Sequence, residues 1–160
     1  MIWLLGAVMA SEFAIINAHI LPVVGAEIEK GTVWVQEGKV TAVGAQVELP
    51  EGISIVDAEG RYLMPGIIDV HSHMGVYSWP STRAHSDGNE ASAPITASVR
   101  AEDSIRVADP AFEKARAGGV TTVMVLPGSA NLIGGMASVI KLRPSRTLQG
   151  MQFPNAPKGM

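Results

Sequence analysis

The sequence contains no cysteine among its 160 residues, which excludes disulfide bonds, thiolate zinc sites and a cysteine nucleophile. It also has no excess of positive charge, because 12 Lys and Arg stand against 15 Asp and Glu. Lys and Arg form no cluster with interleaved aromatic residues. Nucleic acid is therefore not expected as a partner, and any bound metal must be held by histidine and carboxylate side chains.

A hydrophobic run long enough to cross a membrane is also missing, so no membrane span is expected. The apolar run at residues 1–10 has about half the length of a bilayer-spanning helix. Val8-Met9-Ala10 before Ser11 resembles a signal-peptide cleavage pattern, although the basic segment that normally precedes it is absent. Residues 1–12 are thus an apolar leader that fits a signal remnant, a first buried strand or a disordered start. Both a cytoplasmic and an exported location stay open.

The rest of the chain has the composition of a globular protein, 47% hydrophobic and 17% charged. Residues 13–64 hold short β-type runs separated by turn residues, which predicts a small β-rich domain with an antiparallel sheet or half-sandwich. These runs are residues 13–18, 32–36, 39–43 and 54–57. Glu37-Gly38 lies between two of them and predicts a hairpin turn.

After Pro65 the pattern changes to that of an α/β fold. The expected elements are a strand over residues 67–70, a helix over 101–117, and strands over 120–126 and 137–142. The first strand is too apolar for a sheet edge, so burial on both faces is expected. Asp109-Pro110 is a candidate break in the helix, because Asp caps helices and Pro suits their first turn. The succession predicts one βαβ unit.

Two histidines, His71 and His73, stand at the end of this apolar run. Residues two apart in a strand point to the same face, with Cα atoms about 6.5 Å apart. Two imidazoles so placed can converge on one ion of the zinc type. Asp69 shares their face, one layer deeper. The alternative is an ordinary pair of histidines that face solvent or are satisfied by neighbouring groups.

The polar loop after this strand concentrates His85 and Asp87 within a few residues. Long loops are often functional, so contact of these two residues with substrate or metal is one interpretation. A solvated, turn-forming loop is the other. His19, beside an apolar run in the β-rich segment, is expected to be structural.

Three features of the chain resemble the amidohydrolase superfamily, and in particular its imidazolonepropionase-like and prolidase-like metal-dependent hydrolases. They are the β-rich N-terminal segment, the pattern Pro65-Gly66-x-x-Asp69-x-His71-x-His73, and Gly118-Gly119-Val120-Thr121-Thr122-Val123. The resemblance implies an α/β fold in which a β-sandwich portion at residues 13–64 precedes a (β/α)8 TIM barrel starting at residues 65–160. His71 and His73 would be metal ligands at the end of the first barrel strand, and Asp69 would support them.

The resemblance also implies a function. Such proteins hold one or two divalent ions, commonly zinc, and use metal-activated water to hydrolyse C–N bonds of small cyclic or peptide-like amides. A barrel takes about 250 residues, whereas 96 follow residue 64. The barrel is therefore incomplete, and the general base would lie on a missing strand. We expect an N-terminal fragment that is inactive alone. Formation of a homo-oligomer is left open. The alternative is a non-catalytic binding or assembly module, or an unstable partial gene product.

Overall fold

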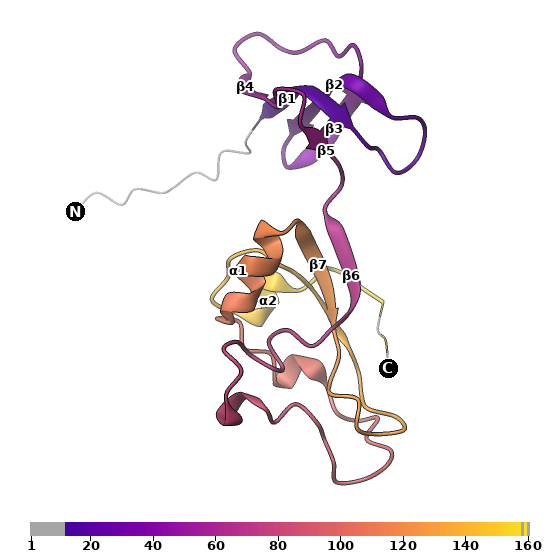
Figure 1. The fold of residues 1–160 in the computed structure, drawn as a ribbon, viewed down its shortest axis with the longest axis vertical. Coiled ribbons are helices and arrows are strands. Elements are labelled where there is room, and N and C mark those ends of the chain that lie inside the picture. The colour runs from indigo at the N-terminus through magenta and orange to yellow at the C-terminus, as the bar shows by residue number, and fades with distance from the viewer. Residues whose placement is uncertain (1–11, 158, 160) are drawn as a thin grey trace, which may run out of the picture. The chain divides into compact units, whose positions relative to one another are not determined.

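The computed structural model describes residues 12–157 and residue 159, so the expected leader lies outside the described residues except for Glu12. The described chain is a mixed α/β structure with mostly strands and few helices. It divides into two compact units between Pro65 and Gly66 (Figure 1). None of the helices found within residues 12–157 has the length and apolar character that crossing a membrane requires.

The first unit is a five-stranded sheet. Its strands are β1 (Phe13–Ile20), β2 (Ile28–Gln36), β3 (Lys39–Gly44), β4 (Ser54–Asp57) and β5 (Tyr62–Leu63). The order is β3-β2-β1-β4, and β5 also pairs with β1. β2 runs antiparallel to β1, whereas β4 and β5 run parallel to it. The sheet is thus mixed and not antiparallel as predicted, because the chain crosses from β3 to the far edge of β1 before it forms β4.

The hairpin between β2 and β3 is confirmed. Gln36 pairs with Lys39, which leaves a turn of two residues. Glu37 and Gly38 have φ angles of 52° and 72°, the left-handed conformation that a tight hairpin turn requires at both positions.

The core of the first unit is small. Ala18, Ile20 and Val33 form its buried cluster, further apolar side chains pack around them, and Ala14 is also buried. The sheet also carries a groove of about 370 Å³ whose lining includes Ile15, Val35 and other apolar side chains. Burial of this apolar groove against another structural element would stabilise the sheet.

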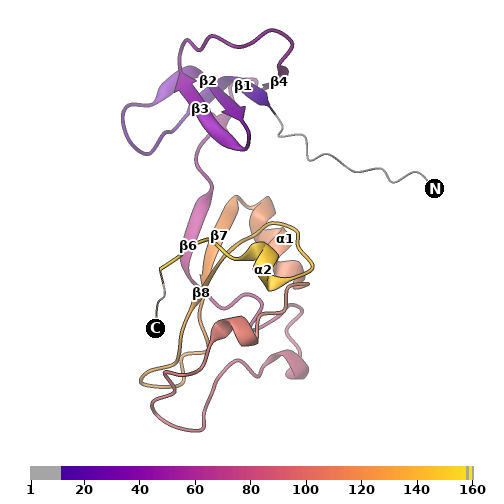
Figure 2. The same ribbon diagram turned by 180° about the vertical axis from the view of Figure 1, so that it is seen from behind.

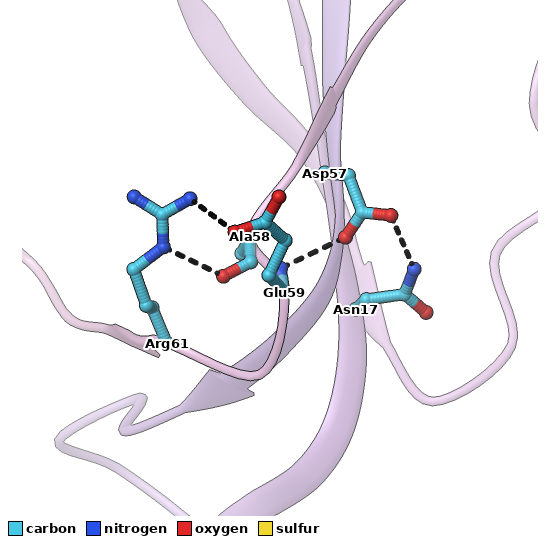
Figure 3. A network of polar contacts seen from close by, with 5 residues as sticks. All are labelled: Asn17, Asp57, Ala58, Glu59 and Arg61. Atoms are coloured by element: carbon cyan, nitrogen blue, oxygen red, sulfur yellow. Dashed lines mark hydrogen bonds and ion pairs between the residues drawn. The ribbon is translucent and has the colours of Figure 1, made fainter.

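A polar network closes the turn between β4 and β5 (Figure 3). The Asp57 carboxylate accepts the Glu59 backbone N–H at 2.8 Å and the Asn17 side-chain amide at 2.9 Å. Both hydrogen bonds hold the pKa of Asp57 below its usual value, and the bond from the Glu59 N–H has the larger effect. Arg61 donates to the Ala58 carbonyl at 3.0 Å and to the Glu59 carboxylate at 3.1 Å. The network ties β4 to the bulge in β1, where Asn17 has a φ of 54°.

The second unit is built on a three-stranded sheet. Its elements are β6 (Ile67–Ser72), the 3-10 turns η1 (Arg83–His85) and η2 (Ala101–Asp103), α1 (Pro110–Ala117), β7 (Val120–Val125), β8 (Ser138–Lys141) and α2 (Leu148–Met151). β6 and β7 are parallel and α1 lies between them in sequence, which confirms the βαβ unit. β8 is antiparallel to β7. The core includes Phe112 of α1, Val123 and Val125 of β7, and Ile140 of β8.

The helix predicted over residues 101–117 forms only in its second half. Residues 101–103 make a 3-10 turn, and the α-helix begins at Pro110. The break has a physical cause at Asp109, whose side chain accepts the N–H groups of Ala111 at 2.9 Å and of Gly75 at 2.9 Å. Its carboxylate therefore caps α1 and at the same time anchors the segment that follows β6.

β6 is less buried than its apolar sequence predicts. The sheet order β6-β7-β8 leaves β6 at the edge within the described residues. Ile68 and Val70 are accordingly 63% and 68% exposed. The expectation of a buried strand away from the sheet edge is therefore wrong for the described residues, because no described strand pairs with the second edge of β6 and the side chains of Ile68 and Val70 are exposed.

Candidate functional site

The two histidines of the motif sit where β6 gives way to a loop. His71 is the penultimate residue of β6, and His73 follows the strand directly. β6 is held in place here by β7, with Ser72 paired to Val125 and the Ser72 carbonyl accepting the Leu126 N–H at 2.8 Å. The two imidazoles therefore project from the carboxyl end of a strand that is registered against its parallel neighbour.

The two imidazoles lie close together. Their ring centroids are 5.3 Å apart and the planes are nearly perpendicular, at 89°. Two imidazoles that bind one tetrahedral zinc through nitrogens about 2 Å from the ion have ring centres about 5 Å apart. His71 is exposed and His73 is partly buried. The spacing of this pair thus fits two ligands of one ion.

Hydrogen bonding sets the tautomer of His73. Its Nδ1 lies 3.0 Å from the carbonyl oxygen of Leu126, which can only accept. The Nδ1 atom must therefore carry the proton, and the neutral ring keeps a lone pair on Nε2. A backbone carbonyl in this position is a common orienting partner of metal-binding histidines.

Asp69 acts on the backbone of the pair. Its carboxylate accepts the N–H of His71 at 3.0 Å, and the residue is partly buried. This contact fixes the strand where the first histidine leaves it.

His85 is bound elsewhere. Its Nδ1 donates to the Pro80 carbonyl at 3.0 Å, and its Nε2 lies 3.1 Å from Nη1 of Arg106. Since a guanidinium only donates, the Nε2 lone pair of His85 is already used. Asp87 is exposed. Within the described residues no three His, Asp or Glu side chains gather in a way that suits a metal ion, so the structure does not bring His85 or Asp87 together with the His71/His73 pair.

His19 belongs to the first unit. Its Nε2 lies 3.0 Å from the Glu27 carboxylate, and its ring centroid is 4.5 Å from that of Tyr62. These contacts connect β1 with β5 and with the start of β2.

A pocket beside His73 contains residues that the sequence patterns did not single out. It has a volume of about 400 Å³, and its lining comprises His73, Tyr77, Asn89, Gly128, Ser129 and Ala130. The Tyr77 ring stands edge-on to that of His73, with centroids 5.7 Å apart. Tyr77 belongs to no periodic pattern, whereas Asn89 lies in the polar loop that also holds His85 and Asp87.

Comparison with known proteins gives relatives of one kind. Amidohydrolase tasK of Hapsidospora irregularis is 46% identical over 114 residues, which cover 69% of this chain and 12% of that protein. The imidazolonepropionase of Klebsiella pneumoniae is 28% identical over 116 residues, or 63% of this chain and 28% of that protein. An adenine deaminase of Dehalococcoides mccartyi is 36% identical over 64 residues, or 40% of this chain and 11% of that protein.

One solved structure agrees with these relatives. An amidohydrolase from Thermotoga maritima matches with a TM-score of 0.82 and 43% identity, over 89% of this chain and 37% of that one. No family model matches the sequence. The chain therefore spans a minor part of the length of each of these relatives.

Proposed function

Since the chain belongs to the amidohydrolase superfamily, we propose that it is the N-terminal part of a metal-dependent hydrolase that cleaves C–N bonds in cyclic or peptide-like amides. The names of the relatives support the hydrolase class. The observation that carries the proposal is the His71/His73 pair, whose ring centroids are 5.3 Å apart. It occupies the carboxyl end of a parallel strand, where active sites of (β/α)8 barrels lie.

In this proposal His71 and His73 hold a divalent ion, commonly zinc in such sites, and the complete enzyme holds one or two. The ion would supply a Lewis acid that polarises a carbonyl and makes water nucleophilic at neutral pH. His73 presents Nε2 because the Leu126 carbonyl holds the proton on Nδ1. Asp69 positions His71 through its backbone N–H. A catalytic zinc site generally has three protein ligands, so the remaining ligand and the general base belong to later strands.

The domain assignment is part of the same proposal. Residues 13–64 form one half of a β-sandwich, and residues 65–160 begin a (β/α)8 barrel. The apolar groove of about 370 Å³ on the first sheet supports the sandwich, because a second layer would bury it. The parallel β6 and β7, joined through α1, support the barrel.

The enzymatic proposal is tested with the full-length protein, expressed from the complete reading frame. The protein is treated with a chelator and assayed for ring opening of a panel of cyclic amides such as hydantoin, succinimide and 2-pyrrolidinone, in which water breaks the ring C–N bond and a single product keeps both the new carboxylate and the nitrogen. We expect hydrolysis to be lost with the metal and restored by Zn²⁺ or Mn²⁺. A protein that hydrolyses none of the panel in any metal form would contradict the proposal.

A second candidate is a non-catalytic binding or assembly module. The exposed edge strand favours it, since Ile67, Ile68 and Val70 of β6 are 46%, 63% and 68% exposed. An unpaired apolar edge promotes association with another chain. Sedimentation of the 160-residue chain tests this second candidate, because a compact monomer would count against association through β6.

A further inference from the structure

The loop after β6 and the loop after β7 lie at the same end of the sheet (Figure 1, Figure 2). Residues of both loops line the pocket that contains His73. The Gly128 N–H donates to the Gly88 carbonyl at 2.7 Å. The Ala130 N–H donates to Oδ1 of Asn89 at 3.1 Å, and Asn131 Nδ2 donates to the Ala93 carbonyl at 2.7 Å. These bonds join residues about forty positions apart, so the pocket between the loops is a built feature of the fold.

Two polar side chains of this pocket, Tyr77 and Asn89, pack closely against glycines. A Cβ atom placed on Gly88 would lie 2.5 Å from the Tyr77 ring. One placed on Gly128 would lie 2.1 Å from Asn89 Oδ1 and 2.3 Å from the Tyr77 hydroxyl. Both glycines are thus needed to seat Tyr77 and Asn89, which hold their positions before any ligand arrives. Side chains fixed in this way lose little entropy on binding.

The orientation of the Asn89 amide follows from its partner. Because the Ala130 N–H is a donor, the atom that meets it must be Oδ1, and Nδ2 is left as a donor. Among residues 12–157 and 159, neither Asn89 Nδ2 nor the Tyr77 hydroxyl has a hydrogen-bond partner. The lining contains no Lys, Arg, Asp or Glu. The described lining of the pocket therefore offers neutral donors.

We infer that this pocket is a substrate subsite, in which Asn89 Nδ2 and the Tyr77 hydroxyl recognise an uncharged amide or lactam carbonyl next to His73. In the metal-free protein the described lining holds no cation that could pair with a carboxylate, so an uncharged carbonyl suits these donors better. This inference rests on the proposed function, because the two donors contribute to catalysis only if the substrate binds beside His73.

Binding is measured on the full-length protein, metal-free and ¹⁵N-labelled, with benzamide and benzoate, two probes of similar size that differ in charge. We expect benzamide to shift the Asn89 side-chain amide and the Gly128 and Ser129 backbone amides in a saturable way, and benzoate to bind more weakly. Asn89→Asp keeps the acceptor for Ala130 but replaces the donor with an anionic oxygen. Loss of one hydrogen bond should weaken benzamide binding about fivefold or more.

Tyr77→Phe is the second variant, because it retains the ring against His73 and Gly88 and removes only the hydroxyl. It should also weaken benzamide binding, by about fivefold. Equal binding of benzamide and benzoate, benzamide shifts elsewhere, no saturable shift, or unchanged binding in both variants would overturn the inference. The assay needs neither metal nor turnover, so its result can be interpreted even if the hydrolase proposal fails.

Discussion

Removal of the Asp109 carboxylate should destabilise the second unit selectively. Asp109 is 3% exposed and accepts three backbone N–H groups. The distances are 2.9 Å from Gly75, 3.1 Å from Trp79 and 2.9 Å from Ala111. The residue thus joins the start of α1 to the loop that follows the histidine pair.

The expected cost of Asp109→Ala is the sum of three losses. Loss of the helix cap at Ala111 costs about 1 kcal/mol. The Gly75 N–H belongs to a buried residue and would be left without a partner, at about 1–2 kcal/mol. Trp79 is 47% exposed, so water replaces part of its bond and the loss there is below about 1 kcal/mol. The free energy of unfolding of the second unit should therefore fall by about 3 kcal/mol.

The two units carry separate reporters for this experiment. The indole resonance of Trp79 reports on the second unit, and that of Trp34, which donates to Glu12 at 3.2 Å, reports on the first. Urea titration followed by NMR should show a lower midpoint for Trp79 and an unchanged one for Trp34. Asp103→Ala, which removes an exposed carboxylate from η2, is the control. If Asp109→Ala unfolds at the same urea concentration as Asp103→Ala, the anchoring role of Asp109 is refuted.

Two further perturbations test other parts of the fold. Gly128→Ala should lower the unfolding free energy of the second unit by about 1–3 kcal/mol, because the new methyl group overlaps Asn89. Gly134→Ala is the control and should be tolerated, because its Cβ would meet its nearest atom at 3.5 Å. Equal melting temperatures of the two variants would contradict this prediction. The pKa of Asp57 is lowered by the Glu59 N–H, so ionised Asp57 stabilises the first unit above the usual carboxyl pKa, and this contribution is lost as the pH falls through the lower folded-state pKa. The stability difference between the wild type and Asp57→Ala should accordingly shrink on acidification, and a difference that stays constant down to full protonation would rule out the depressed pKa.

Local features of the fold were predictable where local chemistry decides them. The Glu37-Gly38 hairpin and the start of α1 after Asp109 both follow from residue types that favour one backbone conformation. The parallel pairing of β1 with β4 was not predictable, because it depends on a crossover between distant segments. The exposure of β6 was also not predicted, because an apolar run does not determine how many strands pair with it or which elements cover its faces.

The candidate site divides in the same way. The spacing of His71 and His73 on one strand predicts their proximity, and the structure places their centroids 5.3 Å apart. The contact between His73 and the Leu126 carbonyl joins the residues that directly follow two neighbouring strands, so no local sequence pattern predicts it. Tyr77 and Asn89 come together only when the two loops pair.

Metal content tests the central claim most directly. The full-length protein, purified without added metal and analysed for its elements, should contain a divalent ion. Joint replacement of His71 and His73 by alanine should remove that ion, because the proposal assigns both imidazoles to the metal. His19→Ala, which changes a histidine of the other unit bound to Glu27, should retain it. Metal content that is equal in the wild type and the double variant would contradict the assignment of this pair.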